Sequence, residues 1–434
     1  MGHHYDIVGA LKGQLSTMNE NSIQKIVEAR AYRKIYQEFF ERKVGGVVIK
    51  TPRVDPSLPN LQAVHTPYDL CHDMVSKLSE YSGSLSGKTI LIFNLEFAEV
   101  MLYNEIGFGV EASQITFITD CEEKFRYASR VQRYAGINVI QVPFNDIKEV
   151  ELNMKFDVVI MNPPYQAKTV NHGVGHTLWD QFVNKSLNDL VKQNGYLCAI
   201  HPSGWRGLGS FKELGLKMKS KQIEFLKIHS MNDGLSTFGA STRYDLYVLH
   251  NDICGHNTTI VGEDGISCDV DLRVLNFIPN FNIEKVYKLI AKDGEKRVDV
   301  VYSRSAYGAD KKHMSITQSA SHPFPCIKYV TKKNCDIDLR WSSTNKNGHF
   351  GIPKVTFGIG IREGGFLVDY EGKYGLCQFT AGIAGTDENE LENIKKALDS
   401  KDFREIMQAC QLSTQLYNKN VISLFRKDFW KEFI

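Results

Sequence analysis

Short runs of mostly apolar residues alternate with stretches of helical spacing between residues 65 and 250. The runs lie at residues 90–93, 115–119, 138–142, 158–161 and 195–200. A run without alternation is typical of a strand buried on both faces of a parallel sheet. Apolar residues at helical spacing after Thr66 and Leu178 predict helices there. This order predicts an α/β fold with a doubly wound sheet and ligand sites along one edge.

The pattern differs on either side of this region. Residues 1–62 combine helical spacing with a proline-bearing linker, which predicts an N-terminal helical arm. From residue 256 onward, short segments rich in Gly, Asn, Ser and Lys alternate with isolated apolar runs, and helical spacing returns after Leu391. We therefore expect an arm and linker at 1–62, a doubly wound domain at 63–255 and an α+β domain at 256–434.

One tetrapeptide with polar and aromatic residues directly follows a predicted buried strand. The run at 158–161 leads directly into Asn162-Pro163-Pro164-Tyr165. Neither proline has an N–H, and each holds the residue before it in an extended conformation, so the strand must stop there. In open α/β sheets, ligands bind at the carboxyl ends of the strands. An amide oxygen, a free carbonyl and an aromatic ring at that place suit the recognition of a planar amine.

Asn-Pro also begins many ordinary turns, and Pro-Pro-Tyr can be a rigid loop that ends in a buried ring. The strand directly before the tetrapeptide favours the functional interpretation. Here the sequence resembles the S-adenosylmethionine-dependent amino-methyltransferases, in particular the DNA adenine-N6 enzymes, whose catalytic motif is a strand followed by Asn-Pro-Pro-Tyr. The resemblance implies that Asn162, Pro163, Pro164 and Tyr165 are catalytic and that S-adenosyl-L-methionine is the cofactor.

Two further segments match the family where it holds the cofactor. Thr66 is a candidate N-cap and Pro67 suits the first position of a helix. By resemblance, this helix start binds the methionine end of the cofactor. Asp120 ends the second strand, where an acid can accept hydrogen bonds from both ribose hydroxyls. A simple N-cap at a strand–helix junction is an alternative role for Asp120.

The third and first strands complete the implied cofactor site. By resemblance, Asp146 accepts from the adenine amino group of the cofactor, Phe144 packs on its ring, and Asn162 also contacts the cofactor. The first strand departs from the family, because the expected glycine-rich turn is replaced by Asn94-Leu95-Glu96-Phe97. Phe93 and Asn94 remain the candidate cofactor contacts at this turn. Either a turn of a different shape holds the cofactor, or this site binds the cofactor poorly.

Later segments match the family's gamma subgroup in their order. The polar, glycine-bearing loop at 166–177 is a candidate lid beside the active site. Its histidines could act as a base or metal pair, but direct methyl transfer to an amine needs no metal. A strand over 195–205 ends in a Pro-Ser loop, and a late strand over 238–249 is expected to contribute to the pocket for an extruded base.

The formal net charge is only +2, so any contact with nucleic acid must come from a local patch. Basic residues lie among aromatic ones in the last third of the chain, although single lysines are mostly just solvated. These residues are Lys311, Lys312, His313, Tyr329, Lys332, Lys333, Trp341, Lys346 and His349. Together they predict phosphate and base contacts of a target-recognition domain at 256–434.

The nine cysteines form no Cys-x-x-Cys pair, which favours a reducing compartment. No apolar run is long enough to span a bilayer, and the N-terminus has no secretory apolar segment. The sequence therefore predicts a cytoplasmic protein, of a bacterium or a phage-infected cell, without membrane association.

By resemblance, we expect a site-specific DNA adenine-N6 methyltransferase similar to those of type II or IIG systems, which would extrude its target adenine from double-stranded DNA. A cognate restriction endonuclease is a candidate second partner. An RNA adenine or protein glutamine N-methyltransferase is an alternative, because it can use the same tetrapeptide. A non-catalytic nucleic-acid-binding relic is another, suggested by the glycine-free turn.

Overall fold

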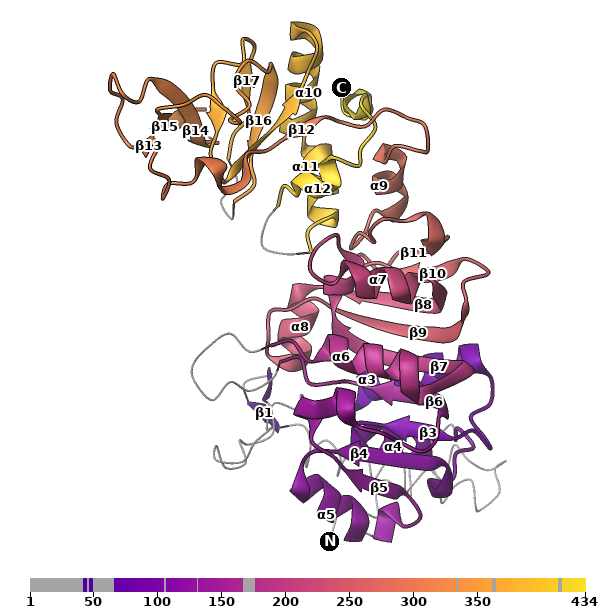
Figure 1. The fold of residues 1–434 in the computed structure, drawn as a ribbon. Coiled ribbons are helices and arrows are strands. Elements are labelled where there is room, and N and C mark those ends of the chain that lie inside the picture. The colour runs from indigo at the N-terminus through magenta and orange to yellow at the C-terminus, as the bar shows by residue number, and fades with distance from the viewer. Residues whose placement is uncertain are drawn as a thin grey trace. The chain divides into compact units, whose positions relative to one another are not determined.

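The structure is a computed structural model that describes residues 42–44, 47–49, 66–104, 107–130, 132–166, 176–332, 335–360, 364–412 and 416–434. The chain divides into two compact units (Figure 1): Met1–Trp205 with Gly209–Leu275, and Arg206–Leu208 with Asn276–Ile434. Most of the expected N-terminal arm lies outside the described residues. Within it, β1 (Arg42–Val44) and β2 (Val47–Ile49) form an antiparallel pair.

The first unit is built on a nine-stranded sheet with the order β11-β10-β8-β9-β7-β6-β3-β4-β5. The pairs β3–β4, β4–β5, β3–β6 and β6–β7 are parallel, whereas β9 runs antiparallel to β7 and β8. This mostly parallel sheet confirms the predicted α/β fold class. The strands are β3 (Ile90–Ile92), β4 (Ile115–Thr119), β5 (Asn138–Gln141), β6 (Phe156–Met161), β7 (Val191–Pro202), β8 (Lys221–His229), β9 (Tyr244–Ile253), β10 (Thr258–Val261) and β11 (Ser267–Val270).

The strand order reverses at β3. From β3 the chain moves outward to β4 and β5, and it then returns to β6 on the other side of β3. The carboxyl ends of β3 and β6 therefore flank a topological switch point, the place where open α/β sheets bind ligands. The tetrapeptide that begins at Asn162 follows β6 directly.

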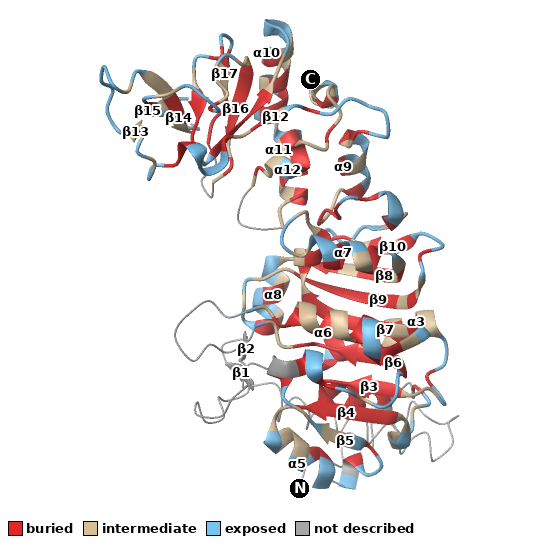
Figure 2. Cartoon of the chain, viewed as in Figure 1, coloured by how far each residue is buried: buried red, intermediate tan, exposed pale blue. Residues whose placement is uncertain are grey.

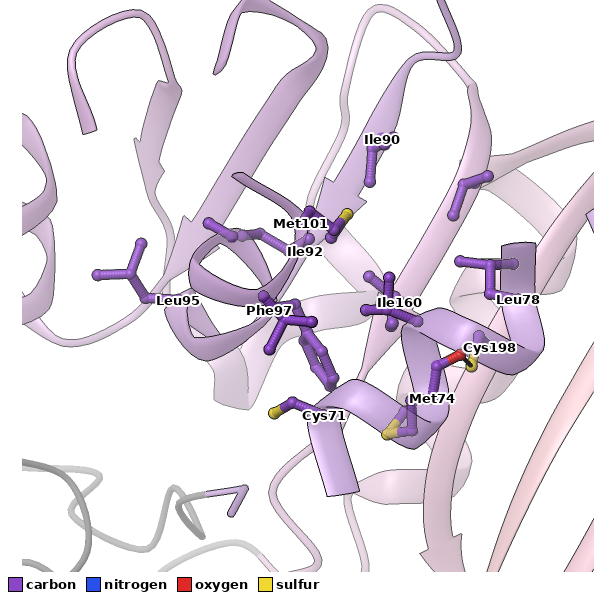
Figure 3. Packing of buried hydrophobic residues seen from close by; sticks show 14 of the residues in the cluster. Cys71, Met74, Leu78, Ile90, Ile92, Leu95, Phe97, Met101, Ile160 and Cys198 are labelled. Carbon is purple, nitrogen blue, oxygen red and sulfur yellow. Dashed lines mark hydrogen bonds between the residues drawn. The ribbon is translucent and has the colours of Figure 1, made fainter. Parts of the chain in front are cut away.

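Helices cover both faces of the sheet, which explains the non-alternating apolar runs. Figure 3 shows Ile90, Ile92 and Ile160 of the sheet packed beside Met74 of α3 and Phe97 of α4. On the opposite face, α6 packs Trp179 against His201 of β7. Figure 2 accordingly shows the central strands as buried. The helices are α3 (Tyr68–Ser82), α4 (Leu95–Tyr103), α5 (Glu122–Arg130), α6 (Trp179–Lys185), α7 (Lys212–Lys219) and α8 (Met231–Phe238), with a π-helical turn η4 (Ser186–Leu190) after α6.

Part of the sheet differs from the sequence interpretation. The late strand begins at Tyr244, because residues up to Phe238 belong to α8. Strand β8 was not predicted, since its lysines and glutamate interrupt the apolar pattern. The boundary expected at residue 255 lies before β10 and β11, which extend the sheet of the first unit so that this unit reaches Leu275.

The second unit combines two four-stranded sheets with helices, an α+β arrangement. One sheet has the order β12-β19-β16-β17 and the other β13-β15-β14-β18. Its apolar core is formed by the first sheet and the C-terminal helices. The elements are α9 (Ile283–Leu289), β12 (Val300–Val301), β13 (Met314–Ser315), β14 (Phe324–Val330), β15 (Ile337–Ser342), β16 (Lys354–Gly358), β17 (Leu367–Asp369), β18 (Gly375–Leu376), β19 (Thr380–Ala384), α10 (Glu388–Asp399), α11 (Lys401–Ala409) and α12 (Lys419–Ile422).

Among the described residues, none of the helices has the length and apolar character needed to cross a bilayer.

Candidate functional site

Asn162 is held by hydrogen bonds from two other segments of the first unit. Its backbone N–H donates to the side-chain oxygen Oδ1 of Asn94 over 2.8 Å. Its side-chain Nδ2 donates to the hydroxyl oxygen of Thr66 over 2.9 Å. Asn162 is only 3% exposed. The structure thus brings three of the predicted site residues into direct contact at the switch point.

Thr66 does not cap helix α3, so the expected N-cap role is wrong. The helix begins at Tyr68, and Pro67 is its N-cap, with the Cys71 N–H donating to the Pro67 carbonyl over 2.9 Å. The Thr66 hydroxyl instead accepts from Asn162. Its backbone N–H donates to the Glu96 carboxylate over a long 3.4 Å.

The glycine-free turn after β3 is filled by side chains. Asn94 is the N-cap of α4, but its side chain accepts from Asn162 and makes no cap hydrogen bond. Leu95, Glu96 and Phe97 are each at most 3% exposed. Glu96 was not anticipated from the sequence, although an acid in the first turn of a helix is favoured by the helix dipole. The turn therefore offers buried polar side chains where the family offers open backbone.

The predicted contacts for the adenosine half of the cofactor lie along the neighbouring strand ends. Phe93 and Phe144 are buried, with ring centroids 6.0 Å apart, and both make edge contacts with Phe182 of α6. Asp120 directly follows β4 and is half-buried. Asp146 lies in the 3₁₀ segment η3 (Phe144–Glu149), but its side chain is outside the described part of the structure.

The rest of the tetrapeptide runs from the core toward the surface. Pro163 is buried, whereas Pro164 and Tyr165 are half-buried. The Tyr165 carbonyl accepts from the Leu178 N–H over 3.1 Å, which ties this segment to the start of α6. The Tyr165 hydroxyl is buried and has no hydrogen-bond partner among the described residues. Burial, with the nearby Tyr244 and Asp245, raises the pKa of Tyr165 above its ordinary range, so the phenol stays neutral.

Strand β9 brings further polar residues to this edge. Its first residues pair with the end of β7, Tyr244 with Pro202 and Asp245 with His201. Asp245 is fully buried and accepts from the Trp205 indole over 2.8 Å. Sequence reasoning missed Asp245, because an acid in the middle of the run Tyr244–Leu249 has no local signature.

Two buried histidines lie near these residues and stay neutral at pH 7. His201 stacks on Trp179 at 4.4 Å between ring centroids, and its Nε2 lies 3.0 Å from the Tyr247 hydroxyl. Burial lowers the pKa of His201 to about 4. His229 stacks on Tyr244 at 4.2 Å, and burial likewise lowers its pKa to about 4. With a pKa of about 4, each ring is a weak base at neutral pH.

The candidate lid is bounded by the bridge pair Gln166 and Thr177, which pair antiparallel. The residues between 167 and 175, with His172, lie outside the described part of the chain, so the lid stays a prediction.

Several similar solved structures are chains of restriction-modification systems. The type IIG restriction endonuclease BpuSI matches with 11% identity and a TM-score of 0.43, over 93% of this chain and 62% of that chain. A type I methyltransferase subunit from Streptococcus thermophilus matches with 13% identity and a TM-score of 0.39, over 64% and 60%. A chain of a type I system matches with 11% identity and a TM-score of 0.39, over 57% and 51%. The matches thus span about half to three fifths of these chains' own lengths.

A search of curated proteins finds no match. Residues 108–234 match the model of the Eco57I restriction-modification methylase family. This segment contains β6 and the tetrapeptide after it. The match confirms the resemblance to restriction-modification methyltransferases that the tetrapeptide indicated.

Proposed function

We propose that this chain is a DNA adenine-N6 methyltransferase that uses S-adenosyl-L-methionine. The observation that carries the proposal is the position of Asn162-Pro163-Pro164-Tyr165. The tetrapeptide follows β6 at the switch point of the sheet and lies within the segment that matches the methylase family. The target amine, the cofactor and the duplex DNA substrate are all part of the proposal.

The residues at the sheet edge fit the adenosine half of the cofactor by their chemistry. Asp120 offers a carboxylate at the end of β4 for a ribose diol, and Phe93 and Phe144 offer an apolar wall for a purine. The methionine half would lie nearer the starts of α3 and α4, where Glu96 supplies a buried carboxylate. We therefore assign the cofactor to this edge.

Each residue of the tetrapeptide has a separate task in the proposed reaction. The bound cofactor supplies an electrophilic methyl group on a sulfonium. The Asn162 side-chain oxygen and the Pro163 carbonyl would accept hydrogen bonds from the target amine and raise its electron density. Tyr165, which is half-buried, would stack on the extruded base. Catalysis would consist mainly of positioning, with the reacting atoms held about 3–3.5 Å apart.

In the second unit, several of the predicted DNA-binding residues lie in or next to the strands of the sheet β13-β15-β14-β18. Strand β13 follows Lys311, Lys312 and His313, and Ser315 of this strand pairs with Trp341 of β15. Lys312 and Lys346 are exposed, and Trp341 is half-buried. Lys333 lies outside the described residues. This arrangement supports a role of the second unit in contacting duplex DNA through phosphates and bases. A cognate restriction endonuclease would be a further partner.

Isothermal titration of the purified protein with S-adenosylmethionine, with and without mixed-sequence duplex DNA, tests the cofactor first. Transfer of labelled methyl groups to adenine-unmethylated DNA, to RNA and to protein extract then tests the substrate. We expect binding of the cofactor and labelling of DNA at adenine N6. Labelling of RNA or glutamine instead would favour the alternative enzymes. Failure of binding in both titrations would favour a non-catalytic nucleic-acid-binding protein.

A further inference from the structure

The three segments that meet at Asn162 form a continuous set of buried polar contacts. Asn94 and Glu96 come from the turn after β3, Thr66 precedes α3, and Asn162 follows β6. Each of these four residues is at most 3% exposed. Hydrogen bonds run from Thr66 to Glu96, from the Asn162 side chain to Thr66, and from the Asn162 backbone to Asn94. We call these four residues the asparagine clasp.

The two bonds to Asn162 restrain different parts of it. The bond to Asn94 fixes the peptide at the point where β6 stops pairing. The bond to Thr66 fixes the rotation of the side-chain amide, because the hydroxyl oxygen accepts from Nδ2. An amide held at its nitrogen presents its oxygen on the opposite edge, as a group that accepts from an amine must do. Both the position and the orientation of the amide are thus determined by side chains outside the tetrapeptide.

The side chain of Asn94 is used in an uncommon way. An asparagine at the N-cap of a helix ordinarily accepts from the helix's own N–H groups. Asn94 is the N-cap of α4 and makes no such bond, because its oxygen is directed to Asn162, 68 residues away in the sequence. The glycine-free turn therefore supplies a group that a glycine at this position could not supply.

We propose that Asn94 and Thr66 are positioning residues for the Asn162 amide. This inference rests on the proposed function, because it assigns Asn162 the task of accepting from the target amine. It differs from the sequence-based expectation, in which Asn94 and Thr66 contact the cofactor. Reactions that depend on positioning can lose about 100-fold in rate from a displacement of about 1 Å. Loss of either bond should therefore lower the rate of methyl transfer more than it weakens the binding of S-adenosylmethionine.

Two pairs of variants test the proposal in the full-length protein. Thr66→Val removes the hydroxyl but keeps the shape of the side chain, and Thr66→Ser keeps the hydroxyl. Asn94→Ala removes the acceptor for Asn162, and Asn104→Ala, at the other end of α4, is the matched control. For each we would measure kcat and KM on adenine-unmethylated DNA, and the Kd for S-adenosylmethionine. Hydrogen–deuterium exchange of the backbone amides around Asn162, measured by mass spectrometry, reports on the asparagine clasp independently of enzyme activity.

We expect Thr66→Val and Asn94→Ala to lower kcat by about 10–100-fold. Thr66→Ser and Asn104→Ala should stay within about 3-fold of the wild type, and the cofactor Kd should change by no more than about 3-fold in all four. Exchange at Asn162 should become faster in Asn94→Ala alone. A loss of cofactor affinity that matches the loss of rate would overturn the proposal and restore the cofactor-contact role. An unchanged kcat in an active enzyme would overturn it as well. A wild-type protein that transfers no methyl group would instead overturn the proposed function on which the inference rests.

Discussion

The indole N–H of Trp205 donates to the carboxylate of Asp245 over 2.8 Å, and both residues are buried. This bond joins the segment after β7 to the first residues of β9, where the two strands pair antiparallel. Asp245 is also one of the groups that raise the pKa of Tyr165. A buried acid outside the tetrapeptide therefore links two segments at the edge of the candidate site.

Trp205→Phe is expected to destabilise the protein by removing a donor from this buried carboxylate. A buried polar group that loses its partner costs about 1–3 kcal/mol, more when it is charged. We expect the free energy of unfolding to fall by roughly that amount, as measured by urea denaturation. Trp430→Phe, which changes a half-buried tryptophan of the second unit, is the control. Equal stability of Trp205→Phe and the wild type would show that the bond contributes nothing net.

Asn162→Ala is expected to abolish methyl transfer and to leave DNA binding largely intact. The substitution removes the group that would accept from the target amine, whereas the basic residues of the second unit are untouched. Methyl incorporation from labelled S-adenosylmethionine measures the first effect, and a filter-binding or anisotropy titration measures the second. Parallel loss of binding and transfer would argue against a catalytic role for Asn162.

Lys312→Ala and Lys346→Ala are expected to weaken DNA binding at low salt and to flatten its salt dependence. Both lysines are exposed in the second unit, near the sheet that carries Trp341. Each phosphate contact contributes about 0.9 to the slope of log K against log salt concentration. We expect the slope to fall by about that amount for each variant and to stay unchanged in Lys292→Ala, another exposed lysine of this unit. Identical slopes in all variants would place the DNA-binding surface elsewhere.

Stability is expected to fall as the pH drops from about 6.5 toward 4. The pKa of His201 is lowered by burial from 6.5 to about 4, so the unfolded chain binds a proton that the folded protein excludes in this range. The contribution of the neutral ring is complete above pH 6.5 and is lost as the pH falls through this window. His229 acts in the same direction. Thermal unfolding from pH 7.5 to 4 should show a shallower decline in His201→Gln, and an identical decline would contradict the assignment.

A buried ion pair in the second unit gives a separate test of its core. Lys354 and Asp369 lie 2.7 Å apart, with side chains 0% and 2% exposed. Removing one partner of such a pair leaves an uncompensated buried charge and costs about 3–5 kcal/mol. Asp369→Asn should destabilise the protein by about that amount. The double variant Lys354→Met, Asp369→Asn removes both charges and keeps an amide oxygen that can accept from the backbone N–H groups of Lys373 and Tyr374. It should recover part of the loss, and a further loss would contradict the unpaired charge as the cause.

Local sequence chemistry determined much of the fold. The apolar runs that became β3, β4 and β6 are local features of the sequence, because a strand covered on both faces needs apolar residues at successive positions. The stop after β6 is also local, because proline lacks an N–H. The tetrapeptide and the acid after β4 could therefore be assigned as candidates from the sequence. Strand β8 could not be predicted in this way. Its charged residues occupy the half-buried positions of the strand and interrupt the apolar run.

Only the tertiary structure decided how the site is assembled. Asn162 bonds to residues 68 and 96 positions away, and these contacts depend on which strands pair and in which register. The local pattern suggested Thr66 as a helix cap, and the family resemblance suggested Thr66 and Asn94 as cofactor contacts. Neither source contains the distant residue with which each side chain pairs. Folding gave both side chains a partner in another segment. By itself the sequence determined which groups are candidates for the chemistry. The sheet order determined which of them meet, because a hydrogen bond needs its two heavy atoms about 3 Å apart.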